Sequence, residues 1–136
     1  MGRKRSDKRP AMSQAETEIM RLLWSQQEAT VQALLDALPP ERDIGYATVQ
    51  TLVRRLEGKG YVQHRREGKA YVYFPAAERE EVVRHTVRDF VDRLFGGDRA
   101  ALMLHLADES ELTDEQVRRL RKMIDRARDG QEDNRG

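Results

Sequence analysis

Residues 46–75 have the sequence YATVQTLVRRLEGKGYVQHRREGKAYVYFP, in which a helical period is followed at once by a strand period. Apolar side chains in the first half recur at i, i+3, i+4 and i+7, the spacing of one helix face: Val49, Leu52, Val53 and Leu56. In the second half, aromatic and β-branched residues flank the short turn Glu67-Gly68-Lys69. We therefore expect a helix that opens at Tyr46 or Ala47 and is closed by Gly60, followed by a β-hairpin over 61–74.

Two further helices are expected before this stretch. Ser13 and Glu16 have the spacing of a capping box, and the apolar residues behind them predict a first helix. Thr30 is a suitable N-cap for a second helix, which Pro39-Pro40 stops. Three helices followed directly by a hairpin is the order of a winged helix-turn-helix, whose third helix enters the major groove of DNA.

The second half of the chain is expected to be helical. Apolar periodicity predicts a helix over 77–95, a short helix capped by Asp98, and a last helix that opens with a capping box at Thr113. The predicted fold class is mainly α with a small β-hairpin. Its expected parts are a flexible basic arm (1–12), a winged helix-turn-helix domain (13–75), a helical dimerisation domain (76–128) and a disordered tail (129–136).

The net charge of +1 hides an uneven distribution along the chain. Lys and Arg number 25 against 24 Asp and Glu, yet residues 1–11 and 54–69 each carry +4, residues 12–53 carry −4 and residues 75–136 carry −3. A basic patch on the third helix and hairpin is typical of a nucleic-acid interface, although a solvated charged face would have the same composition.

The composition excludes several classes of protein. With 136 residues, the chain is too short for a large two-domain enzyme. The absence of cysteine excludes disulfides, thiolate metal sites and cysteine nucleophiles, and it fits a reducing cytosol. No apolar run is long enough to span a membrane. The sequence therefore predicts a soluble cytoplasmic protein with no membrane insertion.

The outer face of the third helix carries the candidate DNA contacts. On a helical wheel, no acid occurs among the residues that lie opposite the apolar face or flank that side: Ala47, Thr48, Gln50, Thr51, Arg54 and Arg55. Gln50 can pair with N6 and N7 of adenine, and Ala47 and the threonine methyls can pack on thymine methyls. Thr48 and Arg54 can instead contact phosphate. Basic residues at the hairpin tip are expected on the DNA backbone: Arg65, Arg66 and Lys69.

Other chemistry finds no support in the sequence. The histidines, His64, His85 and His105, are too widely spaced for a recognisable metal site. The chain has no phosphate-binding glycine loop, dinucleotide fingerprint or nucleophile elbow. We therefore expect no enzyme activity, no metal and no cofactor. The alternative that stays open is a protein-interaction adaptor, in which the winged helix binds an acidic partner without sequence-specific DNA binding.

Three sets of residues resemble the BlaI/MecI-type penicillinase repressors. The first helix contributes Ala15-Glu16, Ile19-Met20 and Leu23-Trp24, the third helix contributes 48–56 and Gly60, and the hairpin contributes 67–73. The resemblance implies a dimeric bacterial repressor that binds a pseudo-palindromic operator in double-stranded DNA. It also implies which residues contact that operator: Ala47, Thr48, Gln50, Thr51 and Arg54 of the third helix, and Arg65, Arg66 and Lys69 of the hairpin.

The resemblance assigns dimerisation to the helices that follow Ala77. Their apolar faces fit this role, because a thin helical segment cannot bury them alone and a second copy of the chain can. The expected dimer interface comprises Val87, Phe90, Val91, Leu94, Leu102, Leu106, Val117, Leu120 and Ile124.

Two departures from the family pattern leave the inducing signal open. The best-known members are cleaved at an Asn-Phe bond when a membrane sensor-protease system acts, and the matching pair here is His105-Leu106. Copper-responsive relatives use cysteine pairs, which this chain lacks. Release from DNA through a sensor-protease partner and release through a ligand both remain open.

Overall fold

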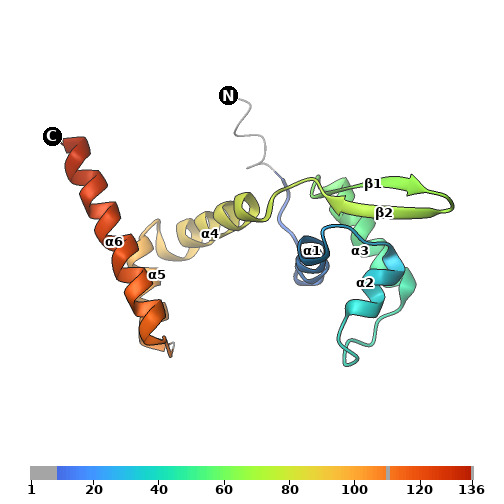
Figure 1. Cartoon of the computed structure of the whole chain (residues 1–136), viewed down its shortest axis with the longest axis horizontal. Coiled ribbons are helices and arrows are strands. Elements are labelled where there is room, and N and C mark those ends of the chain that lie inside the picture. The colour runs from blue at the N-terminus through green and yellow to red at the C-terminus, as the bar shows by residue number, and fades with distance from the viewer. Residues whose placement is uncertain (1–8, 110, 136) are drawn as a thin grey trace. The chain divides into compact units, whose positions relative to one another are not determined.

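The computed structural model describes residues 9–109 and 111–135. Three helices come first, α1 (Gln14–Gln26), α2 (Val31–Ala37) and α3 (Tyr46–Gly58), followed by a hairpin of β1 (Val62–Glu67) and β2 (Ala70–Pro75). Three more helices complete the chain: α4 (Arg79–Phe95), α5 (Arg99–Glu109) and α6 (Asp114–Arg135) (Figure 1). This order confirms the predicted fold class, mainly α with one hairpin and a winged helix at the N-terminal end.

The helix starts that the sequence predicts are confirmed. At α1, the Ser13 hydroxyl accepts from the Glu16 backbone N–H at 3.1 Å, while the Ser13 N–H donates to the Glu16 carboxylate at 2.8 Å. The Thr30 hydroxyl caps α2 by accepting from the N–H of Ala33. Asp98 and Thr113 cap α5 and α6 in the same way. Each cap satisfies a first-turn amide that has no partner within its helix.

The core of the winged helix lies where α1, α2 and α3 pack together. Its most deeply buried side chains are at most 1% exposed: Ile19, Met20, Leu23, Leu34, Val49, Val53 and Leu56. Three of these side chains, Val49, Val53 and Leu56, belong to the predicted apolar face of α3. The fourth member of that face, Leu52, is also buried, with 7% of its surface exposed. The helical period therefore places these side chains inside by the spacing alone.

The hairpin is antiparallel and is extended by one residue from the α1–α2 connection. Its register pairs Val62 with Pro75 at the base and Glu67 with Ala70 at the turn. Ala29 bridges the outer edge of β2, because its N–H and C=O each form a 2.9 Å hydrogen bond with the backbone of Tyr73. Side chains alternate between the two faces, so His64 and Arg66 share one face of β1 and Arg65 lies on the other.

The prediction that residues 1–12 form a flexible arm is wrong for residues 9–12, and residues 1–8 lie outside the described residues. The Tyr61 hydroxyl donates to the Pro10 carbonyl at 2.7 Å, the Lys59 ammonium to the Ala11 carbonyl at 2.8 Å, and Arg9 Nε to the Gly60 carbonyl at 3.0 Å. Composition could not reveal this, because the partners are backbone carbonyls, which every sequence has.

The predicted disordered tail is also corrected, since α6 continues through Arg135 and only Gly136 lies outside the description. The prediction of disorder rested on Gly130 and on the charged residues of the tail. Once a helix is nucleated, each further residue costs little, and Arg, Gln and Glu are good helix formers.

The boundary between the two parts of the chain lies later than the sequence predicts. The chain divides into two compact units within α4, after Asp89, and not after residue 75. Ala77 and Val82 belong to the core of the first unit, and the Trp24 indole N–H donates to the Ala77 carbonyl at 3.0 Å. Pro75 ends the strand, but the residues that follow it continue to cover the same core. No helix in the described ranges is both long and apolar enough to cross a membrane.

Candidate nucleic-acid interface

The outer face of α3 is exposed as the helical wheel predicts. The sixth candidate residue, Gln50, is half-buried. The other five are exposed: Ala47, Thr48, Thr51, Arg54 and Arg55. The Thr51 hydroxyl donates to the Ala47 carbonyl at 3.0 Å, so its proton is already used within the helix. This face presents neutral and basic side chains, which suits a surface that has to approach phosphate.

Tyr46 is an exposed aromatic residue at the start of α3 that sequence reasoning treated only as a helix boundary. Its side chain is 48% exposed. Gly45 precedes it as the N-cap and offers no side chain to satisfy the first-turn amides. Free amides at an exposed helix start are available to water or to an anion. The signal that could have found Tyr46 is the combination of an aromatic first residue with an uncapped start.

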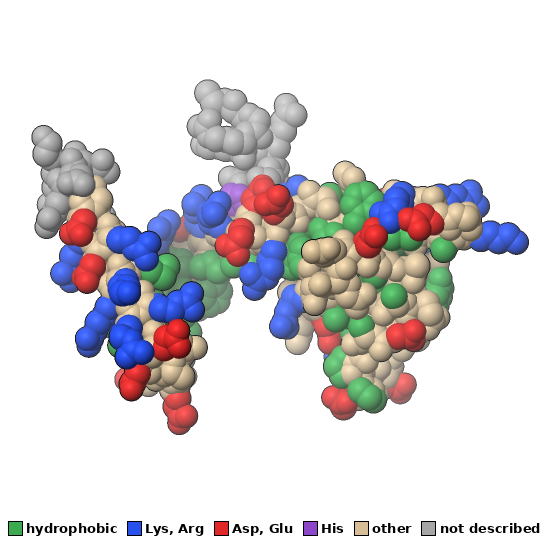
Figure 2. Space-filling model, viewed as in Figure 1, with side chains coloured by type: hydrophobic (Ala, Val, Ile, Leu, Met, Phe, Trp, Pro, Cys, Tyr) green, Lys and Arg blue, Asp and Glu red, His purple; other side chains and the backbone are tan. Residues whose placement is uncertain are grey.

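The three basic residues of the hairpin differ in their surroundings. Arg65 Nη2 lies 2.5 Å from a carboxylate oxygen of both Glu28 and Glu67, and these hydrogen bonds, with Glu28 first, raise the pKa of Arg65. Arg66 lies over the ring of Tyr71 at 5.7 Å, and Lys69 is exposed at the turn. Figure 2 shows Lys and Arg side chains gathered at the free end of the hairpin. Of the three, Arg65 has to give up two carboxylates before it can bind a phosphate.

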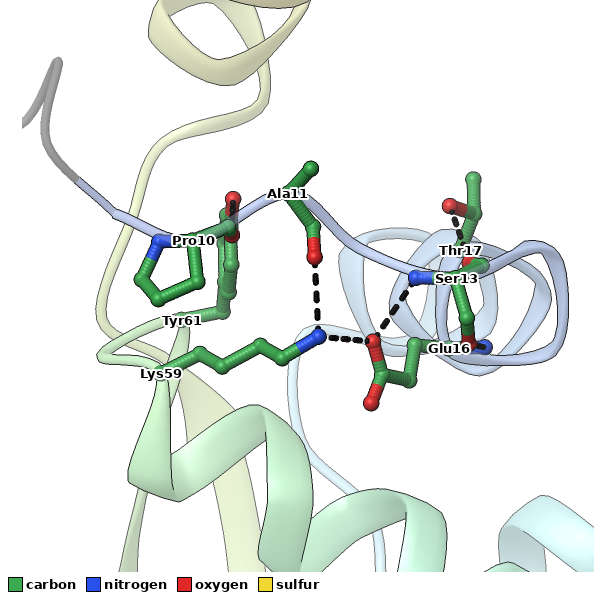
Figure 3. A network of polar contacts seen from close by, with 7 residues as sticks. All are labelled: Pro10, Ala11, Ser13, Glu16, Thr17, Lys59 and Tyr61. Carbon is green, nitrogen blue, oxygen red and sulfur yellow. Dashed lines mark hydrogen bonds and ion pairs between the residues drawn. The ribbon is translucent and has the colours of Figure 1, made fainter.

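A buried ion pair anchors the C-terminal end of α3 to the start of α1 (Figure 3). The carboxylate of Glu16, which is 2% exposed, lies 2.7 Å from the ammonium of Lys59 and also accepts from the Ser13 N–H. Burial raises the pKa of Glu16, but the hydrogen bonds from Lys59 and Ser13 outweigh it and hold the pKa below its ordinary value. The anchor thus keeps a charged pair inside the protein and fixes α3 against α1.

Tyr61, which belongs to the same network, keeps its proton over the ordinary pH range. Burial, the largest cause, raises the pKa of Tyr61 above its ordinary value. The neutral hydroxyl keeps its proton and donates it to the Pro10 carbonyl. The chain segment before α1 is thereby held on the same side of the domain as the end of α3 (Figure 3).

Most of the residues expected at the dimer interface are accessible within one chain. Leu102 and Val117 are half-buried, and six others are between 39% and 66% exposed: Val87, Phe90, Leu94, Leu106, Leu120 and Ile124. Val91 differs, because it is only 3% exposed within the single chain and has little surface left for a partner. The sequence prediction omitted five exposed apolar residues of this part of the chain: Val83, Met103, Leu104, Leu112 and Met123.

A metal centre is not evident among the described residues, which contain no cluster of three or more His, Asp or Glu side chains able to hold an ion. The surfaces that suit binding of a partner are the outer face of α3, the hairpin and the exposed apolar side chains of α4 to α6.

The Penicillinase repressor family model matches residues 12–126 of the chain. The methicillin resistance regulatory protein MecI of Mammaliicoccus sciuri is 24% identical over 115 residues, which cover 85% of this chain and 94% of that protein. The penicillinase repressor of Bacillus licheniformis is 24% identical over 116 residues, which cover 85% and 91%.

Two solved structures are similar to part of this chain. The DNA-binding domain of the repressor BlaI is 30% identical and covers 54% of this chain and 90% of that domain, with a TM-score of 0.49. The Bacillus licheniformis BlaI monomer in complex with the blaP half-operator is also 30% identical, with the same coverage and a TM-score of 0.47.

Proposed function

Because this chain belongs to the penicillinase repressor family and is a DNA-binding repressor, we propose that it acts as a homodimer on a pseudo-palindromic operator. The observation that carries the proposal is the set of candidate contacts on the outer face of α3, five of the six exposed and none of them acidic, together with the basic side chains at the hairpin tip. A two-fold symmetric protein matches a two-fold symmetric DNA site, so each copy would read one half of the operator.

We assign base reading to the middle of α3 and backbone contacts to its edges. Gln50 reads adenine, and Ala47 and Thr51 pack on thymine methyls in the major groove. Thr48, Arg54 and Arg55 contact phosphates. Arg66 and Lys69 hold the neighbouring backbone, and Arg65 contributes only where phosphate displaces Glu28 and Glu67. The relative whose structure is described with a half-operator supports this mode of binding.

The support for a homodimer is the amount of apolar surface on α4 to α6. Exposed apolar side chains recur along all three helices, among them Phe90, Leu94 and Leu106, and a large amount of exposed apolar surface marks an interface. Because a DNA-binding repressor of a bacterial family acts where the DNA lies, the proposal places the protein in the cytoplasm.

Selection of bound fragments from genomic DNA tests the proposed function directly. The full chain should enrich a small set of sequences, and footprinting should show a protected pseudo-palindrome. The affinity should fall steeply with salt, because neutralised phosphates release counterions. Binding without sequence preference would refute the repressor function. Failure to bind DNA at low salt, together with recovery of an acidic protein partner, would favour the adaptor alternative.

Gln50→Ala and Arg66→Ala should have different signatures on the enriched operator. We expect Gln50→Ala to cost about 1–2 kcal/mol and to relax preference at one base position, because a bidentate contact to adenine is lost. Arg66→Ala should weaken all sequences about equally and reduce the salt slope by about one phosphate contact. Fluorescence anisotropy on a panel of single-base operator variants distinguishes the two. A base-selective loss for Arg66→Ala would show that the hairpin is wrongly placed.

A further inference from the structure

The hairpin contacts α3 through a polar joint between His64 and Glu57. His64 Nδ1 lies 2.6 Å from Glu57 Oε2, and the two side chains are 37% and 33% exposed. Glu57 is the one acid of α3, and it follows Gln50 and Arg54 at i+7 and i+3 on the same side of the helix. The only carboxylate of the recognition helix is therefore bonded to the hairpin.

Aromatic rings extend this joint along the inner face of the hairpin. The His64 ring lies 4.8 Å from the ring of Tyr71 and 5.5 Å from that of Tyr73. Tyr71 in turn lies under the guanidinium of Arg66. Burial raises the pKa of Tyr73, and the positive charge of Arg54 of α3 acts on Tyr73 in the opposite direction and lowers that pKa. The charged and titratable groups around His64 are thus Glu57 and Arg54 from α3, both tyrosines from β2, and Arg66 from its own strand.

A hairpin of two strands is only marginally stable by itself, so its angle to the rest of the protein has to be fixed by contacts at its base. His64 supplies such a contact, since it joins α3 to the chain of rings that ends at Arg66. A hairpin that is already held at the binding angle loses less conformational entropy when DNA binds. The joint thereby positions Arg66 for the backbone.

The joint also has an electrostatic role. The carboxylate of Glu57 would repel the phosphates that approach α3 if it were free to turn toward them. Its contact with His64 Nδ1 holds it at the hairpin instead.

We propose that His64 and Glu57 form a positioning pair, which sets the angle of the hairpin against α3 and so holds Arg66 in place for the operator backbone. The inference rests on the proposed DNA-binding function. It adds two residues that do not themselves touch DNA.

A double-mutant cycle on the full chain tests the pair. We expect His64→Gln and Glu57→Gln each to weaken binding to the genomically selected operator about three- to tenfold, and the double variant to be no weaker than either single one. The matched control is the Glu18–Arg42 ion pair, with 2.8 Å between its atoms, which lies away from the hairpin. Glu18→Gln and Arg42→Gln should leave operator affinity unchanged. Losses that simply add would overturn the proposal.

The salt dependence separates positioning from a merely structural role. His64→Gln should reduce the salt slope by about one phosphate contact, as Arg66→Ala does, because the joint holds Arg66 at the backbone, while thermal unfolding shows the variant folded. An unchanged salt slope would overturn the proposal. If the wild-type protein bound no operator at all, the proposed function would fail, and that outcome is distinct from a retained operator with an unchanged slope.

Discussion

Phe90→Glu combined with Leu94→Glu is expected to convert the protein from a dimer to a monomer at micromolar concentration. The two side chains lie one turn apart on α4 and are 43% and 66% exposed. Burying two carboxylates in an apolar interface costs more than such a contact gains, because neither charge would have a partner. Sedimentation equilibrium measures the change directly.

Operator affinity should fall with the loss of the dimer. When two winged helices bind the halves of one site together, the second binding event is intramolecular, and this linkage is worth about 10²–10⁴-fold. The variant should therefore bind a full operator about as weakly as a half-operator. Anisotropy with both duplexes makes the comparison.

A control on the same helix shows whether the loss is specific to the apolar face. Arg88→Gln with Asp92→Asn changes the opposite face of α4 and should stay dimeric. Circular dichroism checks that α4 remains helical in both proteins. A double-glutamate variant that remained a dimer would contradict the proposal and would place the interface elsewhere.

Lys59→Met should lower the free energy of unfolding of the N-terminal unit by about 2–4 kcal/mol, because it leaves Glu16 buried without its cation. The usual cost of breaking a buried pair is about 3–5 kcal/mol, and we reduce it because the Lys59 side chain is 27% exposed. Urea unfolding at neutral pH measures the loss. Arg42→Met, which breaks an exposed pair with Glu18, should cost about 1 kcal/mol or less.

The Glu16 carboxylate also makes stability depend on pH in a defined direction. Its pKa is lower in the folded protein than in the unfolded chain, so the pair stabilises the fold fully above the ordinary glutamate pKa of about 4.3. That contribution is lost as the pH falls below this value and through the folded pKa. Wild-type stability should therefore drop in acid more than that of Glu16→Gln. Equal acid sensitivity of the two proteins would show that Glu16 is not the group responsible.

The elements of the fold and the face of α3 could be predicted because they depend on local chemistry. A cap joins residues three apart, as with Ser13 and Glu16, and the apolar face repeats every three or four residues. The exposure of Thr51 and Arg54 follows from the same period. These features need no knowledge of what the rest of the chain does.

The contacts that modify the site could not be predicted in this way. Arg65 was expected to be available to DNA, but Glu28, from the connection between α1 and α2, holds it. The spacing of the histidines argues against His64 as a metal ligand and identifies no partner for it, and Glu57, which it contacts, lies on another element. Each pairing depends on how the hairpin packs against the rest of the protein. The alternation of side chains along its strands does not reveal that packing.

The sequence alone determined the order of helices and strands, the buried and exposed faces of α3 and the family of the protein, because each rests on residues close together or on a shared pattern. Only the tertiary structure decided which basic side chains remain available at the hairpin tip, where α4 joins the first core, and that residues 9–12 are anchored. Those outcomes depend on side chains and carbonyls that are distant in sequence and meet only when the core forms. The sequence shows that Arg65 is positively charged, but only the folded structure shows that Glu28 and Glu67 bind it.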